Sequence, residues 1–308
     1  MIAASRTHSA DAHEGRAPGT LLRVFAPRIA VYLSLAALCL GLSACAGKEP
    51  AHSAAQGAAP APGASSSSAA PSPSATRQPG TAATGVKPEV VKHGPRTGNK
   101  VALTFDADMT DFMQKQLAEG KIASYANLKI LDLLEKEKIP TTFFLTGQWV
   151  EQYPDVTRRI TGNPIFEVAN HSYEHMGFVP KCYTLPQLSP QLMTTDVSRT
   201  FDVIKPYGGR QTRYFRFPGG CYDQAALQAL APLGLTVIEW DVVSGDPFAT
   251  AYKPIVNAVL STVQAGSIVV LHITEGNAQY TDEAMPEILA GLKQKGLQPV
   301  TLSELLGG

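Results

Sequence analysis

From Val101 to the C-terminus, short apolar runs alternate with longer stretches in which apolar residues recur every three or four positions. The short runs are rich in Val, Ile, Phe and Thr, which favour extended backbone, and we predict a strand at each of them. The predicted strands are Val101–Phe105, Thr141–Leu145, Ile165–Ala169, Tyr214–Phe217, Thr236–Val242, Ser267–Leu271 and Gln298–Leu302.

The longer stretches carry helical periodicity. Within Tyr125–Lys138 the leucines fall on one face, and Pro140 ends the pattern. The predicted helices are Tyr125–Lys138, Leu192–Lys205, Gln224–Leu233, Tyr252–Gln264 and Asp282–Lys295. Repeated alternation of strand and helix is typical of an α/β fold with a parallel sheet, either closed into a barrel or doubly wound. Both arrangements place functional side chains at the C-terminal ends of the strands.

The N-terminal part of the chain has a different pattern. A fourteen-residue apolar run, Ile29–Leu42, follows Arg23 and Arg28. The run is shorter than the about 20 residues of a membrane-spanning helix, and its basic flank is typical of a secretory signal peptide. It leads into Leu-Ser-Ala-Cys, which ends at Cys45 and resembles the lipobox of bacterial lipoproteins. We therefore expect residues 1–44 to be a lipoprotein-type signal peptide and Cys45 to be lipidated. The alternatives are an ordinary signal peptide with a chance cysteine, or a short membrane anchor.

A linker is predicted over residues 45–87. Between Ala51 and Gly80, 25 of 30 residues are Ala, Ser, Pro or Gly. Such a composition buries too little apolar surface to offset the chain entropy, so we predict disorder there. Residues 88–308 then form one folded domain of ordinary size. We expect the protein outside the cytoplasm, in the cell envelope, and attached to the membrane through its lipid anchor alone.

Charge and cysteine content narrow the functional classes. The 308 residues carry 26 basic and 26 acidic side chains, and this balance argues against nucleic-acid binding, which needs a basic surplus. No protein partner is implied. Cys39 lies in the predicted signal peptide, which leaves Cys182 and Cys221 in the domain. Outside the cytoplasm these two can form a disulfide or remain buried free thiols, and the sequence leaves both open.

Polar residues gather at the ends of four predicted strands. They are Asp106 and Asp108 after the first strand, His171 and His175 after the third, Arg216 and Gly219 at the end of the fourth, and His272 after the sixth. The chain has seven histidines, and the three beyond His93 all fall at these ends. Singly, these residues could be turn carboxylates, a surface ion pair or core histidines. Together they indicate one site.

These residue types suit metal-dependent hydrolysis. His171 and His175 are spaced to point the same way on one helical turn, and a carboxylate completes a set of three ligands. Such a set suits one divalent metal ion, Zn²⁺ first, with Co²⁺, Ni²⁺ and iron as alternatives. Metal-activated water then serves as nucleophile, a second carboxylate as base and a further histidine as acid. An arginine can orient the base, and a glycine N–H can bind an oxyanion.

The same motifs resemble the polysaccharide deacetylase family, the NodB-homology type of metal-dependent carbohydrate esterase. The resemblance runs from about Val101 to Leu306 and rests on Thr-Phe-Asp, His-Ser-x-x-His, Arg-x-Pro-x-Gly and a closing Leu-His. It implies a distorted seven-stranded (β/α) barrel and removal of N-acetyl, or O-acetyl, groups from a sugar polymer. The implied roles are Asp106 as catalytic base, His171 and His175 as metal ligands, Arg216 as the residue orienting the base, Gly219 as the oxyanion-binding N–H and His272 as general acid.

The chain departs from the family pattern at the first motif. The family's adjacent aspartates are separated here by Ala107. We expect Asp108, on a one-residue bulge, to be the metal carboxylate and Asp106 to be the base. Asp106 as the metal ligand is the alternative.

A second departure lies near the fifth strand. Val243 stands where the family has an aspartate that tunes the acid histidine, and Pro247 replaces a tryptophan of the substrate groove. Asp241 lies two residues before Val243, on the same face of an extended strand, and is a candidate for that tuning role. We therefore expect activity, with a pH optimum and a groove that differ from those of relatives.

Two other functions fit parts of the pattern. His171–His175 also reads H-x-x-E-H, the inverted zinc-peptidase pattern with Glu174 as base, although it directly follows a predicted strand. A non-catalytic sugar-binding lipoprotein on the same fold is the other alternative. The main prediction is a metal-dependent deacetylase acting on an acetylated polysaccharide of the cell envelope, with the N-acetylglucosamine of peptidoglycan as the first expected substrate. The aromatic residues considered for stacking on sugar rings are Tyr173, Tyr183, Tyr222 and Trp240.

Overall fold

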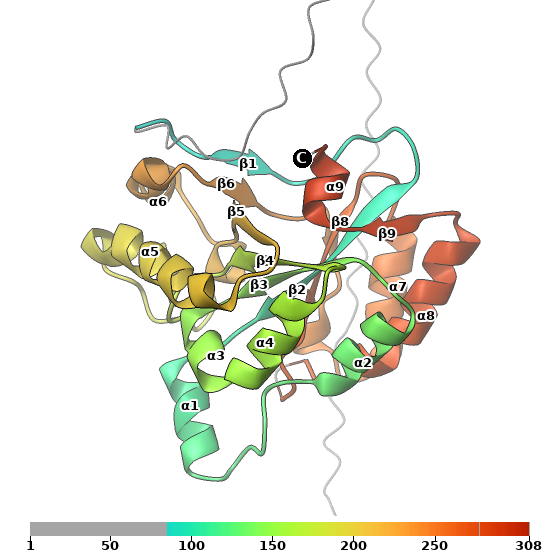
Figure 1. Ribbon diagram of the computed structural model, residues 1–308, viewed down its shortest axis with the longest axis horizontal. Coiled ribbons are helices and arrows are strands. Elements are labelled where there is room, and N and C mark those ends of the chain that lie inside the picture. Colours follow the sequence, from blue (N-terminus) through green and yellow to red (C-terminus); the bar gives the residue numbers. More distant parts are fainter. Residues whose placement is uncertain (1–84, 277, 308) are drawn as a thin grey trace, which may run out of the picture. The chain divides into compact units, whose positions relative to one another are not determined.

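The strands of the computed structural model form one curled sheet (Figure 1). The structure describes residues 85–276 and 278–307, so the predicted signal peptide, Cys45 and most of the predicted linker lie outside the described residues. The strands are β1 (Glu89–Val91), β2 (Lys100–Ala107), β3 (Thr141–Leu145), β4 (Phe166–Asn170), β5 (Gln211–Phe215), β6 (Thr236–Ile238), β7 (Val242–Val243), β8 (Ile268–His272) and β9 (Gln298–Val300). Neighbours follow the order β1-β6-β5-β4-β3-β2-β8-β7, and β9 pairs with β2.

All pairings between these strands are parallel, as predicted. Each predicted strand overlaps a strand of the sheet, although the stretch Thr236–Val242 divides into β6 and β7. The strand β1 was not predicted, because three residues carry no periodic signal. Within the described residues no pairing joins β1 to β7, so the sheet is an open half-barrel. The prediction of a distorted parallel α/β barrel is confirmed.

Helices connect most of the strands. They are α1 (Asp111–Ala118), α2 (Leu128–Lys136), α3 (Gly147–Gln152), α4 (Pro154–Gly162), α5 (Met193–Ile204), α6 (Gln224–Leu230), α7 (Tyr252–Thr262), α8 (Thr281–Gln294) and α9 (Leu302–Leu306). The predicted helices correspond to α2, α5, α6, α7 and α8. In α2, the Asn127 side chain caps the first turn, and Ile130, Leu131 and Leu134 are buried. No helix of the described residues is both long and apolar enough to span a membrane.

The strand β2 shows how the fold positions the site. Its odd-numbered side chains from Val101 to Ala107 lie in the largest apolar cluster, together with residues of α2, α7 and α8. Side chains alternate along a strand, so the even-numbered positions face the other way. Ala102 belongs to a separate cluster, while Thr104 and Asp106 are buried polar side chains. One face of β2 is therefore core, and the other carries polar groups to the end of the strand.

Candidate active site

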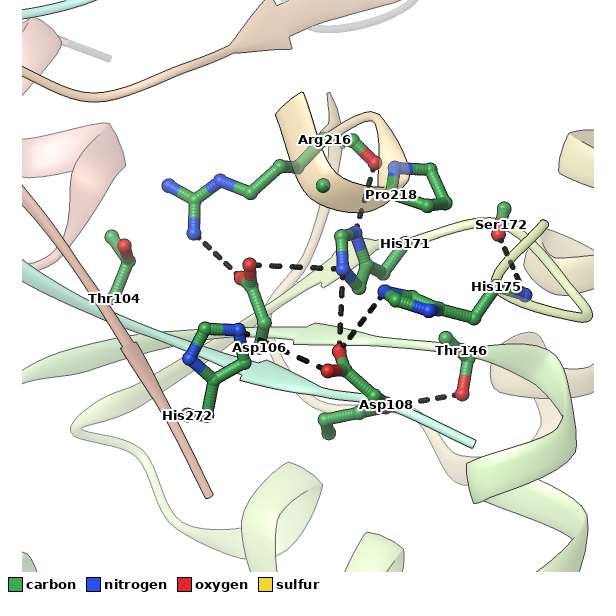
Figure 2. Close-up of polar contacts among 12 residues, drawn as sticks. Thr104, Asp106, Asp108, Thr146, His171, Ser172, His175, Arg216, Pro218 and His272 are labelled. Atoms are coloured by element: carbon green, nitrogen blue, oxygen red, sulfur yellow. Dashed lines mark hydrogen bonds and ion pairs between the residues drawn. The ribbon is translucent and has the colours of Figure 1, made fainter. Parts of the chain in front are cut away.

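The strand ends bring most of the predicted site residues together (Figure 2). β2 and β8 are neighbours, and their register sets Asp106 opposite His272. The site lines a pocket of about 450 Å³, whose walls include Asp106, Asp108, His171, His175, Gly219 and His272. A larger apolar pocket of about 600 Å³ lies among α2, α8 and β9 and contains none of the predicted site residues.

The two aspartates face the same side because β2 stays regular. Its pairing with β3 continues without a register shift through Asp106 opposite Phe144 and Ala107 opposite Leu145. Residues two apart on a strand point the same way, so Asp106 and Asp108 both face the pocket. Ala107 points away and is fully buried in the apolar cluster. The predicted bulge is therefore wrong: β2 continues through Ala107 without a register shift.

Arg216, directly after β5, holds Asp106. Its Nη1 donates to Asp106 Oδ1 at 2.6 Å, and its Nε donates to the Ile238 carbonyl at 3.2 Å. The side chain is fully buried, and its guanidinium carbon lies 4.0 Å from the centre of the Phe144 ring. A buried charge-assisted hydrogen bond fixes the orientation of the carboxylate and balances its charge. The second oxygen, Oδ2, lies 3.6 Å from His171 Nε2.

Asp108, His171 and His175 form a set of possible metal donors. Each offers one ligand atom, and these atoms lie within 4.8 Å of one another. Asp108 Oδ1 is 3.4 Å from His171 Nε2 and 3.3 Å from His175 Nε2, yet it is buried with no hydrogen-bond partner. A buried oxygen without a partner is costly unless a ligand satisfies it. The three residues therefore fit a divalent metal ion.

The hydrogen bond of His171 and the charges of Asp108 and His175 suit that fit. His171 Nδ1 donates to the Arg216 carbonyl at 2.9 Å, which leaves the Nε2 lone pair toward Asp108 in the neutral ring. Burial raises the pKa of Asp108, but the three histidines around it outweigh burial and hold the pKa well below its usual value. Burial lowers the pKa of His175 to about 4. At neutral pH Asp108 is ionised and His175 is neutral, the states in which these side chains bind metals.

The loop that carries the two histidines is not a helical turn. Ser172 and His175 have φ angles of 69° and 54°, in the left-handed region. The Asn170 side chain accepts from the Ser172 N–H at 2.9 Å, and the Asp196 carboxylate of α5 accepts from the Tyr173 N–H at 2.8 Å. The expectation of a helical turn is wrong, because side-chain hydrogen bonds to the loop backbone hold the two rings together. The zinc-peptidase alternative, which needs this motif within a helix, loses its support.

His272 is held by Asp246, which was not predicted. Its Nδ1 donates to Asp246 Oδ1 at 2.8 Å, and its N–H donates to Asp246 Oδ2 at 2.8 Å. Burial lowers the pKa of His272, but Asp246 and Asp108 outweigh burial and raise it to about 10. The ring is therefore protonated at neutral pH, and its Nε2 lies 3.8 Å from Asp108 Oδ2.

The predicted tuning role of Asp241 is wrong. Asp241 accepts from Arg96 at 2.7 Å and from the Ile268 N–H at 2.8 Å. Ile268 begins β8 whereas His272 ends it, and four residues of strand span about 13 Å. The chain turns after β7, and a short 3₁₀ turn, Asp246–Phe248, brings Asp246 to the far end of β8. Asp246 is present in the sequence motif near the predicted fifth strand, but its spacing from His272 alone did not reveal this turn.

Gly219 lies on the pocket wall with a φ angle of 62°. A Cβ there would lie 2.9 Å from Cys182 Sγ and 3.1 Å from the Tyr183 ring, so only glycine fits. Cys182 and Cys221 form a disulfide, which the sequence had left open. It ties the segment after the histidine loop to the Gly219 turn.

The four aromatic candidates have different environments. Tyr173 is buried and its hydroxyl donates to Glu151 at 2.6 Å, so it is not available for a sugar. Tyr222 stacks on Phe217 with ring centres 5.3 Å apart. Trp240 and Tyr183 both line the pocket, and Tyr183 is 72% exposed.

Comparisons with known proteins show which family this chain resembles. A sequence model of the family described as polysaccharide deacetylase matches residues 93–238. The peptidoglycan-N-acetylglucosamine deacetylase of Bacillus cereus is 27% identical over 213 residues, which are 69% of this chain and 70% of that protein.

Solved structures show the same fold. The crystal structure of the Bc1960 peptidoglycan N-acetylglucosamine deacetylase has a TM-score of 0.58 and 25% identity, covering 71% of this chain and 92% of that chain. A family 4 acetyl xylan esterase from Clostridium thermocellum, in complex with a cobalt ion, has a TM-score of 0.54 and 27% identity, covering 67% and 89%. The half-barrel, the clustered strand-end residues and these matches show that the chain is a hydrolase of the polysaccharide deacetylase family.

Proposed function

We propose that this polysaccharide deacetylase removes N-acetyl groups from an N-acetylhexosamine polymer of the cell envelope. The first candidate substrate is the N-acetylglucosamine of peptidoglycan. The observation that carries the proposal is the pocket in which an Arg-held carboxylate, a possible metal set and a protonated histidine face one another. The named activity of the Bacillus cereus relative supports the choice of polymer. O-acetyl groups are the alternative target.

Asp108, His171 and His175 would hold one divalent metal ion, Zn²⁺ first. When bound, such an ion polarises the acetyl carbonyl and makes water a stronger acid. Asp106, oriented by Arg216, is placed to take a proton from the attacking water.

The remaining residues act on the other side of the scissile bond. His272, kept protonated beside Asp246, is placed to donate a proton to the departing amine. The Gly219 N–H is assigned to the oxyanion, as the family motif implies. An amine is a poor leaving group, so cleavage of an amide depends on this proton.

The test measures acetate release from N-acetylglucosamine oligomers and from peptidoglycan. We expect release to be lost on chelation and restored by Zn²⁺ or Co²⁺, and to be lost in His171→Ala together with metal binding. A chain that binds one metal ion but releases no acetate from any acetylated glycan would overturn the proposal in favour of a sugar-binding protein. Release that survives complete removal of the metal would overturn the metal dependence.

A further inference from the structure

Two exposed aromatic side chains stand at the mouth of the pocket. Tyr183 is 72% exposed and Phe248 75% exposed, the highest values among the large hydrophobic side chains of the described residues. Their ring centres are 5.9 Å apart and the rings are tilted by 31°. Both residues line the pocket that contains Asp106 and His272. Water-exposed aromatic faces beside an active site are typical of ligand-binding surfaces.

The fold holds Tyr183 in place. It follows Cys182, whose disulfide to Cys221 ties the segment to the turn of Gly219. Its φ angle of 49° is unfavourable for a bulky side chain, and such strain persists only where the surrounding structure imposes it. The Cys182 carbonyl accepts from the Leu185 N–H at 3.0 Å, which closes a turn around Tyr183. The ring also packs against Gly219, where a Cβ would lie 3.1 Å from it.

Phe248 is held from the other side of the pocket. It ends the short 3₁₀ turn that begins at Asp246, and its N–H donates to the Gly245 carbonyl at 3.1 Å. Asp246 binds His272, so this turn positions both the assigned acid and the aromatic ring. On its side of the pocket, the Tyr183 ring lies next to Gly219, whose N–H is assigned to the oxyanion. The aromatic pair therefore lies beside both residues that are assigned to the reacting acetamido group.

We propose that Tyr183 and Phe248 form one platform that stacks on the apolar face of a pyranose ring of the glycan, and that the Cys182–Cys221 disulfide positions Tyr183 for this contact. The inference rests on the proposed function. Pyranose rings present C–H groups on their faces, and these pack against the electron-rich face of an aromatic ring. The platform contributes affinity for a polymer of sugar rings and takes no part in the proton transfers.

The test measures binding of an N-acetylglucosamine hexamer by calorimetry, in the metal-loaded Asp106→Asn background, in which turnover is expected to be strongly slowed. Tyr183→Ala and Phe248→Ala are each expected to weaken binding about tenfold. Tyr183→Phe and Phe248→Tyr keep the rings and should keep the affinity. Phe112→Ala is the matched control, because Phe112 is 67% exposed on α1 and does not line the pocket.

The disulfide is tested by a double-mutant cycle. Cys182→Ser with Cys221→Ser should weaken hexamer binding as much as Tyr183→Ala, and should cause no further loss once Tyr183 is already alanine. Metal content should stay unchanged in each variant. Alanine variants that bind the hexamer as tightly as the parent would overturn the platform, even though the parent protein releases acetate. A parent protein that neither binds nor deacetylates acetylated glycans overturns both proposals.

Discussion

Asp106 and Asp108 differ only in what surrounds them, and their partners assign them different roles. Asp106 is bound to Arg216, whereas Asp108 lies between His171 and His175. We predict that Asp108→Asn weakens Zn²⁺ binding by more than about 100-fold, since even residues behind the ligands contribute 10–100-fold. Asp106→Asn should keep the metal and lower kcat by about 10²–10⁴-fold. Chelator competition and acetate release measure the two effects.

The reverse pattern, with metal lost in Asp106→Asn and retained in Asp108→Asn, would exchange the two roles. Both variants need a check by circular dichroism. Removing the Asp106 charge leaves the Arg216 guanidinium buried without its partner, and breaking a buried ion pair costs about 3–5 kcal/mol of stability.

Asp246 and Asp241 form a second informative pair, because only Asp246 contacts His272. Asp246→Asn removes the charge that keeps the acid protonated, so kcat for the N-acetyl glycan should fall by about 10²–10⁴-fold. Hydrolysis of p-nitrophenyl acetate, whose leaving group departs without protonation, should fall much less. Asp241→Asn is the matched control and should leave both rates unchanged. Equal losses on both substrates in Asp246→Asn would contradict a general-acid role for His272.

At the scale of elements, α5 supports the histidine loop through one buried carboxylate. Asp196 accepts from the Tyr173 N–H, and burial raises its pKa to about 6. The native state therefore holds more protons than the unfolded chain between about pH 4 and pH 6, so this group's contribution to stability is lost as pH rises through that range. The lost contribution is up to about 3 kcal/mol.

Asp196→Asn should remove this pH dependence of the free energy of unfolding. Urea unfolding of the metal-free protein is expected to show that the variant gains stability relative to wild type between pH 4 and pH 7. Asp202→Asn, an exposed change on the same helix, is the control and should give a constant difference. A pH-independent difference for Asp196→Asn would mean that this carboxyl does not titrate in that range.

The elements also show where prediction from sequence reaches its limit. The helices α2 and α8 carry apolar stripes and were predicted, whereas four of the six residues of α3 are buried, so it has no amphipathic pattern. The strand ends located the candidate site because chain order places them at one edge of a parallel sheet. Asp246 was missed as the partner of His272 because the turn after β7 brings the two together. They lie 26 residues apart in the sequence. Periodicity contains no information on such a contact.

At the scale of the whole molecule, we propose that Cys45 is lipidated and that the protein is anchored to a membrane of the cell envelope, outside the cytoplasm. The proposal rests on the Leu-Ser-Ala-Cys sequence after the apolar run. Acyl chains contribute about 0.8 kcal/mol per buried CH₂, and two of them give stable attachment. Such an anchor would hold the catalytic pocket near a polymer of the cell envelope.

Cys45→Ser discriminates among the three interpretations of the N-terminal sequence. A lipoprotein should lose palmitate labelling and move from the membrane fraction to the soluble extracytoplasmic fraction, whereas Cys39→Ser, within the apolar run, should change neither. With an ordinary signal peptide, wild type and Cys45→Ser would both be soluble. With a membrane anchor, both would stay in the membrane fraction. Acetate release by purified Cys45→Ser should equal that of wild type, because the lipid is expected to set where the enzyme acts and to leave its chemistry unchanged.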